Sequence, residues 1–362
     1  DRHLDAVLLP SADPHLSEYL PERWQGRQRF SGFTGSMGTL VVTTTGAVCF
    51  ADSRYWVQAE AELAGTGVAL ERIATGAASA HIEWLAANLP AGGSLAVDGA
   101  VLGLGTARQL RAALAPRGIR LVTDVDLLDA AWADRPGLPT APVYEHKAPH
   151  AATPRAAKLA QLREAMARQG ATHHFVSTLD DICWITNLRG ADVSYNPVFL
   201  AHLLVDLSGA TLFVGDNKID AALQAALAAD GVRLAPYAQA PQALGALAAG
   251  SVLLVDPKRV TLGLREAVAA GTRVVEAINP STLAKSRKGP VEAGFIREAM
   301  AEDGAAMCAF YAWFEAAMAR GERISELTID ERLSAERARR PGFVGLSFST
   351  IAGFNANGAL PH

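Results

Sequence analysis

The 362-residue sequence lacks the features that would place it in several large classes of protein. It holds only three cysteines, Cys49, Cys183 and Cys308, and no Cys-x-x-Cys pair, so neither a disulfide framework nor a cysteine zinc site is expected. All three lie in apolar surroundings, which predicts buried, reduced thiols. No apolar run reaches the roughly 18 residues of a membrane helix, and the first residues do not have the pattern of a signal peptide. These absences predict a cytoplasmic protein without a membrane partner.

An excess of positive charge is also absent. The sequence has 33 basic and 37 acidic residues, a net charge of −4. A nucleic-acid partner would require clustered positive charge, so none is expected. Hydrophobic residues make up 50% and charged residues 19% of the chain, which favours packed cores over global disorder. The length predicts two or three domains.

Familiar catalytic and metal-binding motifs are missing as well. There is no HExxH, no GxSxG and no P-loop. His173 and His174 are neighbours on a predicted strand, so their side chains point to opposite faces and cannot chelate one ion. Asp180 and Asp181 fit an acidic helix start or turn better than a metal site. No metal ligand is therefore assigned within this sequence.

What the sequence does contain is an internal repeat. Asp52 and Asp216 follow corresponding strands 164 residues apart, and Asp98 and Asp256 follow another pair 158 residues apart. Strands separated by Ala-rich helices predict two α/β domains, produced by duplication and packed side by side. The expected strands are 6–10, 39–43, 48–51, 94–98 and 120–122 in the first copy, and 172–176, 198–205, 211–214, 251–256 and 273–275 in the second.

Prolines and a long helical pattern mark the domain limits. We expect a first domain at 1–132, a proline-rich linker at 133–155, a second domain at 156–280 and a third beginning at 281–362. In the third, a helix is expected from Pro290 to the stop at Gly321, followed by a helix with a capping box from Thr328 to Glu331. Two helices and the Gly-rich stretch 343–362 cannot bury a core, so we expect this domain to be incomplete as given. The long helix should bury one apolar face made of Ile296, Met300, Met307, Tyr311, Phe314 and Met318.

Two residues are candidates for a functional site. Arg54 follows a strand end, beside Asp52 and before Tyr55, where it either forms a structural ion pair or contacts a ligand. His362 follows the Gly-rich stretch, and its imidazole could serve a metal, a proton or a substrate carbonyl. The residues alone leave both alternatives open in each case.

Several stretches resemble the Xaa-Pro aminopeptidase (aminopeptidase P) family, in its three-domain cytosolic type, of the pita-bread metallopeptidase superfamily. The first copy carries SGFTGSMGTL and FADSRYWVQA, and the second carries STLDDICWITNLRGADVSYNPVF. The third domain carries KSRKGPVEAGFIREAM and GLSFSTIAGFNANGALPH. The matches extend over nearly the whole chain.

The resemblance implies two creatinase/prolidase N-terminal-like (ribonuclease-H-like) α/β domains, followed by the first part of a pita-bread α+β catalytic domain. It implies removal of the first residue from peptides with proline second, two divalent metal ions, usually manganese, and a homodimer. The family's metal ligands follow the last motif, so this chain alone is expected to bind no metal and to be inactive. By motif, His362 corresponds to the substrate-binding and catalytic histidine, and Arg54 to an arginine that binds the far end of the substrate.

Two other functions remain compatible with the sequence. The chain could be a non-catalytic binding or dimerisation module, or a pseudoenzyme. Within the same fold it could belong to a prolidase- or creatinase-like hydrolase, although two N-terminal copies favour the aminopeptidase.

Overall fold

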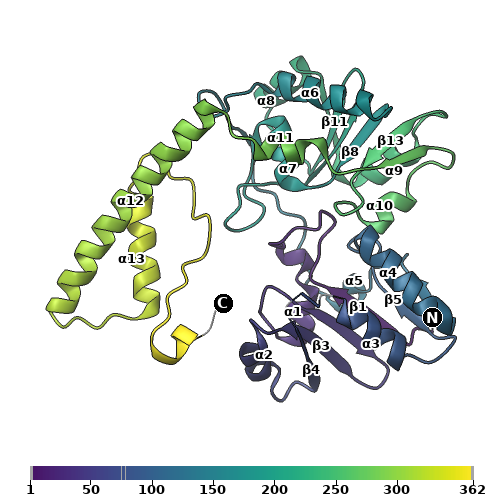
Figure 1. The fold of residues 1–362 in the computed structure, drawn as a ribbon, viewed down its shortest axis with the longest axis horizontal. Coiled ribbons are helices and arrows are strands. Elements are labelled where there is room, and N and C mark those ends of the chain that lie inside the picture. Colours follow the sequence, from purple (N-terminus) through teal and green to yellow (C-terminus); the bar gives the residue numbers. More distant parts are fainter. Residues whose placement is uncertain (1–2, 75, 78, 360–362) are drawn as a thin grey trace. The chain divides into compact units, whose positions relative to one another are not determined.

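The computed structural model describes residues 3–74, 76–77 and 79–359. The chain forms two compact units (Figure 1). The first comprises residues 1–146, 153–193 and 197–286, and the second comprises 147–152, 194–196 and 287–362. The first unit contains both copies of the repeat, and the second contains the long helix.

The first copy is built on a six-stranded sheet with the order β4-β3-β2-β1-β5-β6. Strand β1 pairs antiparallel with β2 and parallel with β5. The strands are β1 (Ala6–Pro10), β2 (Thr39–Thr43), β3 (Ala47–Asp52), β4 (Val68–Ile73), β5 (Ser94–Ala96) and β6 (Arg120–Val122). The helices are α1 (Gly26–Ser31), α2 (Trp56–Leu63), α3 (Ala80–Asn88), α4 (Leu104–Leu114) and α5 (Leu128–Ala131), with the 3-10 turns η1 (Glu22–Trp24) and η2 (Ala115–Arg117).

The second copy repeats this arrangement. Its six-stranded sheet has the order β12-β11-β10-β8-β13-β14. The strands are β8 (His173–Val176), β10 (Ala201–Asp206), β11 (Ala210–Val214), β12 (Val232–Pro236), β13 (Val252–Val255) and β14 (Arg273–Glu276), and β7 (Tyr144–Glu145) pairs with β9 (Leu188–Arg189) apart from this sheet. The helices are α6 (Arg155–Arg168), α7 (Leu179–Thr186), α8 (Ala221–Ala229), α9 (Ala240–Gly245), α10 (Leu262–Glu266) and α11 (Pro280–Ser286), with the 3-10 turn η3 (Tyr237–Gln239).

The duplication expected from the sequence is confirmed by the strand order. Each strand of one sheet has a counterpart at the same place in the other, with the same parallel or antiparallel neighbours. The sequence did not predict β4 and β12, which lie at corresponding edges. Edge strands carry charged side chains and proline, as at Arg72 and Pro236, and this weakens their apolar pattern.

The two copies meet through equivalent residues. Gly103 and Thr261 form an antiparallel bridge and are themselves 158 residues apart, the spacing of the repeat. The Leu104 N–H donates to the Val260 carbonyl at 3.0 Å, and the Leu262 N–H donates to the Leu102 carbonyl at 2.7 Å. Leu104 and Leu262 are 158 residues apart, as are Leu102 and Val260, so each of these two hydrogen bonds is the counterpart of the other in the repeat. The copies therefore pack about a local two-fold axis, like the subunits of a symmetric dimer.

Helices cover both faces of each sheet. In the first copy, α3 and α4 pack on one face, and α2 and the segment after α1 pack on the other. In the second copy, α9 and α10 cover one face and α6, α7 and α8 the other. The α3–α4 core and the α9–α10 core form one continuous apolar cluster, which joins the two copies into a single unit.

The second unit contains α12 (Pro290–Ala319), α13 (Glu326–Ala338) and the 3-10 turn η4 (Asn355–Ala359). The expected long helix is present, but only Met307 and Phe314 of the apolar face assigned to it are even partly buried. Ile296, Met300, Tyr311 and Met318 are exposed, whereas Ala306, Phe310 and Ala317 are buried. Within the described part of this unit, α13 packs against α12, and the buried face of α12 is the one that carries Ala306, Phe310 and Ala317. No helix of the described residues is long and apolar enough to cross a membrane.

The structure also tests the expectations for the cysteines, the capping box and the segment before Pro290. Cys49 and Cys183 are buried as predicted, but Cys308 lies exposed on α12. The capping box lies at Ser325 and Thr328 rather than at Thr328 and Glu331, because α13 begins three residues earlier than expected. The segment before Pro290, where the third domain was expected to begin at residue 281, contains α11.

Candidate functional site

Arg54 lies just beyond the carboxyl end of β3, where the chain turns into α2. Its guanidinium forms a two-pronged ion pair with Asp52: Nε donates to Oδ1 at 3.1 Å and Nη2 donates to Oδ2 at 2.8 Å. The backbone N–H of Arg54 also donates to Oδ1 at 3.1 Å. The side chain of Asp52 is 5% exposed and that of Arg54 is 36% exposed. The pair therefore has a buried acidic end and a solvent-facing basic end.

An aromatic ring supports the guanidinium. The centroid of the Tyr55 ring lies 5.2 Å from Arg54 Cζ, within the range of a cation–π contact. Tyr55 is buried, and its hydroxyl lies 2.6 Å from Ser36 Oγ. Its ring also packs edge-on against Phe33, with centroids 6.0 Å apart. The segment 33–36 thus fixes the ring beneath Arg54.

The glycine in this segment is required by packing. A Cβ at Gly35 would lie 2.3 Å from Cζ of Phe33 and 2.8 Å from Cδ1 of Tyr55. No cradle for a phosphate is involved, because the two aromatic rings occupy the space.

Buried Arg27 holds the same segment from the other side. Its Nη1 donates to the Phe33 carbonyl at 2.8 Å, its Nε donates to Ser11 Oγ at 2.7 Å, and its Nη2 donates to the Gly35 carbonyl. Burial lowers the pKa of this guanidinium. Since every donor group faces a neutral oxygen, Arg27 serves as a structural brace and Arg54 as the exposed cation.

The charges around Arg54 favour its protonated form. The hydrogen bonds to Asp52 raise the pKa of the Arg54 guanidinium, and the charge of Glu18 adds to this effect. No described residue accepts a hydrogen bond from Nη1 of Arg54. This nitrogen can donate to a planar oxygen acceptor arriving from solvent.

His362, the second candidate, lies outside the described residues. The motif before it is described as far as residue 359. Within it, the Phe354 N–H donates to Glu326 Oε1 at 2.6 Å, and Asn357 Nδ2 donates to Glu326 Oε2 at 2.9 Å. Glu326 is the first residue of α13, so this helix anchors the loop that leads to His362.

The described residues contain no group of three or more His, Cys, Asp or Glu side chains that could hold a metal ion. His174 is buried with Nδ1 3.0 Å from the Leu254 carbonyl, whereas His173 lies partly exposed on the other side of β8. Asp180 and Asp181 lie in the first turn of α7, as expected, and both form ion pairs with Lys285. These residues therefore do not fit a dinuclear metal centre.

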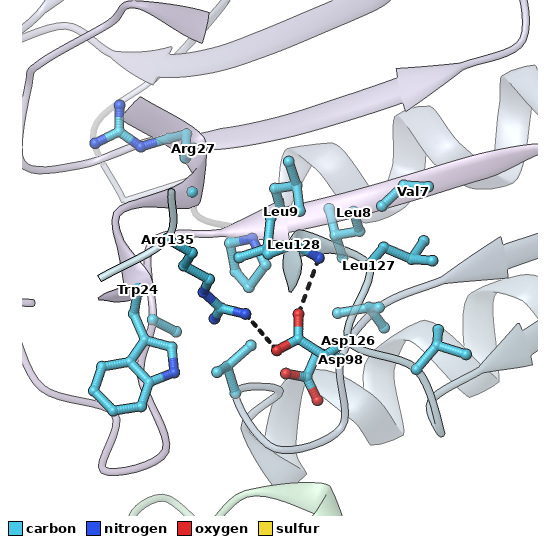
Figure 2. Close-up of a pocket in the computed structure, with 16 residues that line it drawn as sticks. Val7, Leu8, Leu9, Trp24, Arg27, Asp98, Asp126, Leu127, Leu128 and Arg135 are labelled. Atoms are coloured by element: carbon cyan, nitrogen blue, oxygen red, sulfur yellow. Dashed lines mark hydrogen bonds and ion pairs between the residues drawn. The ribbon is translucent and has the colours of Figure 1, made fainter. Parts of the chain in front are cut away.

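A small pocket at the carboxyl ends of β1 and β5 was not foreseen. It encloses about 30 Å³, room for one or two waters, and is lined by Trp24, Asp98, Asp126 and Arg135 among others (Figure 2). Arg135 donates to Asp126 Oδ2 at 2.5 Å, and Asp126 Oδ1 accepts from the Leu128 N–H at 2.9 Å. Burial raises the pKa of Asp98 to about 6, and the nearby Asp126 acts in the same direction. The cavity is too small for a peptide.

A buried polar network joins the two copies. His15 donates from Nδ1 to the Ser177 carbonyl at 2.7 Å, and its Nε2 accepts from the Tyr237 hydroxyl at 2.8 Å. The ring of His202 lies 4.5 Å from that of His15. Burial lowers the pKa of both histidines, which favours the neutral form of both imidazoles in this contact. Single histidines in a sequence give no indication of such a network.

Comparison with known proteins identifies all three domains. The Creatinase/Prolidase N-terminal domain matches residues 1–129 and again residues 134–292. Metallopeptidase family M24 matches residues 294–362. Each copy of the repeat thus corresponds to one N-terminal domain, and α12 falls within the M24 match.

Curated relatives and one solved structure match almost the whole chain. Aminopeptidase P2 of Arabidopsis thaliana is 32% identical over 99% of this chain and 55% of its own length. Xaa-Pro aminopeptidase 1 of Dictyostelium discoideum is 31% identical over 100% of this chain and 59% of its own length. The X-prolyl aminopeptidase of Caenorhabditis elegans, described as a cytosolic enzyme with a di-nuclear active site, superposes with a TM-score of 0.88 at 25% identity, over 95% of this chain and 57% of that one.

The chain spans between half and about three-fifths of the length of these relatives. Sequence, domain order and fold agree over that part. The chain belongs to the aminopeptidase P family, with two creatinase/prolidase N-terminal domains followed by the M24 metallopeptidase domain.

Proposed function

We propose that the complete protein is a metal-dependent aminopeptidase that removes the first residue from peptides with proline in second position. The observation that carries this proposal is the match of all three domains, in order, to Xaa-Pro aminopeptidases over 99–100% of this chain. The related C. elegans enzyme is described as cytosolic and di-nuclear. We extend both properties to the complete protein, with manganese as the metal, a cytoplasmic location and a homodimeric state.

Two metal ions supply, when bound, a nucleophilic hydroxide and polarisation of the scissile carbonyl. Because the described residues hold no ligand set for them, we assign no step to particular metal ligands. The roles proposed for this chain are those of binding. Arg54 holds the far end of the peptide through its solvent-facing nitrogen. His362 hydrogen-bonds the peptide beside the scissile bond.

The domain limits proposed for the protein remain 1–132, 156–280 and a catalytic domain from 281, with the linker at 133–155. The two N-terminal domains form one compact unit, in which a continuous core and a pair of symmetry-related hydrogen bonds join them. In this proposal, they present Arg54 on a fixed support.

The test is peptide cleavage by the complete protein supplied with Mn²⁺. We expect release of the first residue from an Xaa-Pro-Xaa tripeptide, none from the matching Xaa-Ala-Xaa tripeptide, and loss of activity with a chelator. Absence of cleavage of the proline peptide in the metal-loaded protein would refute the proposal and favour a non-catalytic module.

The two binding residues are tested separately. Arg54→Ala should raise KM with unchanged metal content, because it removes a contact remote from the reacting bond. His362→Ala should lower kcat by about 100-fold or more with folding preserved, as is typical for loss of a hydrogen bond to the reacting carbonyl. Near-normal turnover of the His362 variant would exclude that role.

A further inference from the structure

The carboxylates around Arg54 decide which kind of acceptor it can hold. Asp52 occupies the Nε edge and one hydrogen bond of Nη2, so the positive charge is opposed at contact distance by a buried negative charge. Glu18, which is exposed, also acts on the guanidinium. The Arg54 cation is therefore opposed by one carboxylate in direct contact, and the charge of a second carboxylate adds a smaller effect.

We propose that Asp52 determines the specificity of Arg54: because its charge is offset, Arg54 holds a peptide carbonyl oxygen rather than favouring a free terminal carboxylate. This inference rests on the proposed contact between Arg54 and the peptide, and it narrows that contact to one chemical group.

The reason is the difference between hydrogen bonding and net charge. Nη1 remains available as a donor, and a carbonyl oxygen gains that hydrogen bond in full. A carboxylate at Nη1 would gain the same hydrogen bond, but it would also be repelled by the Asp52 carboxylate. It would lie roughly twice as far from Asp52 as from the guanidinium. Since Coulomb energies fall only with the inverse of distance, about half of the attraction is cancelled, and Glu18 cancels more. The carboxylate therefore loses most of its usual advantage at an arginine.

The geometry also keeps Arg54 from turning away from Asp52 to form a new pair. Asp52 accepts from the Arg54 backbone N–H as well as from its side chain, and the Tyr55 ring lies beneath the guanidinium. Tyr55 is in turn held by Ser36. Packing thus sets which donor Arg54 presents to solvent.

The experiment compares one Xaa-Pro-Xaa tripeptide as the free acid and as the C-terminal amide, using the complete metal-loaded protein. In the wild type we expect the ratio of kcat/KM, acid over amide, to lie within about threefold of one. In Asp52→Asn the ratio should rise about fivefold at low salt and fall back at high salt, because the uncovered charge is screened. Both substrates are measured on the same variant, so a general loss of stability cancels from the ratio.

Glu60→Gln is the matched control. Glu60 forms an exposed ion pair with Arg72 at 2.7 Å in the same domain, and Arg72 lies 5.9 Å from the Trp56 ring. The variant therefore removes one carboxylate charge and breaks an ion pair without touching the hydrogen bonds between Asp52 and Arg54. Its ratio should equal that of the wild type. If Asp52→Asn does not fold, Glu18→Gln replaces it, since that side chain is exposed, and the ratio should rise about twofold.

Different failures are distinguishable. A wild-type preference for the free acid of more than tenfold overturns the inference, as does an unchanged ratio in Asp52→Asn when Arg54→Ala raises KM. If Arg54→Ala leaves KM for both substrates unchanged in an active enzyme, the proposed contact itself is wrong and the inference falls with it. Loss of all proline-peptide cleavage in the wild type refutes the proposed function instead.

Discussion

Replacing Asp98 by Asn should stabilise the protein at neutral and alkaline pH. Asp98 lies in the small pocket at the end of β5, where burial raises its pKa to about 6 from a usual value near 3.8 (Figure 2). Above that pH the folded protein must hold a poorly hydrated carboxylate beside Asp126. An asparagine removes the charge and can still accept the 2.8 Å hydrogen bond from the Ala100 N–H.

The magnitude follows from the shift. A rise of about two pKa units corresponds to about 3 kcal/mol between the two protonation states, and access of solvent to the pocket reduces this to about 2 kcal/mol. Because the folded pKa is raised, the stability from the protonated carboxyl is fully present below about pH 4 and is lost as the pH rises through about 6. The gain from Asp98→Asn should therefore be full at pH 8 and close to zero at pH 4.

The assay is urea denaturation at pH 4, 6 and 8, followed by tryptophan fluorescence, since Trp24 lines the same pocket. Asp126→Asn is the control of opposite sign, because Asp126 is an ion-pair partner of the buried Arg135. It should destabilise the protein. A gain for Asp98→Asn that is equal at pH 4 and pH 8 would refute the electrostatic reasoning, and a loss at pH 8 would show that the charged form is stabilised.

Three further predictions test the packing of the N-terminal domains. Gly35→Ala should cost about 2–3 kcal/mol through overpacking, whereas Gly46→Ala, where an added Cβ meets nothing within 4 Å, should cost little; equal thermal denaturation midpoints would contradict this. Lys218→Met should cost about 3–5 kcal/mol because it leaves the buried charge of Asp192 unpaired, and the double variant with Asp192→Asn should recover part of the loss in urea titrations. The free energy of unfolding should fall as the pH drops below about 6.5, because His15 is buried neutral and its lowered pKa lets the unfolded chain bind more protons; a pH profile unchanged in His15→Gln would assign the loss to other groups.

The repeat was predictable because it depends on local patterns. Apolar strands ending in Asp52, Asp98, Asp216 and Asp256 recur at nearly constant spacing, and the structure places each at the end of a corresponding strand or just beyond it. The buried face of α12 was not predictable. Apolar residues recur on more than one face of that helix, and α13 selects one of them by contact.

At the candidate site, too, one part was predictable from the sequence and another depended on tertiary contacts. The sequence marks Arg54 as a basic residue beside an aspartate after a strand, which favours a structural pair and leaves a ligand contact open. The structure shows the pair and also the free donor Nη1, because Tyr55, Ser36 and Gly35 fix how far the guanidinium reaches into solvent. Tyr55 follows Arg54 directly, but Ser36 and Gly35, which hold the Tyr55 ring, lie about twenty residues away in the sequence.

By itself, the sequence determined the duplicated α/β architecture, the family and the positions of its motifs, because periodicity and short motifs are properties of neighbouring residues. Only the tertiary structure decided that the two copies pack about a local two-fold axis at Gly103 and Thr261, and that Asp98 is an acid with a raised pKa. Burial and charge depend on which distant segments come together, and that is settled only when the chain has folded.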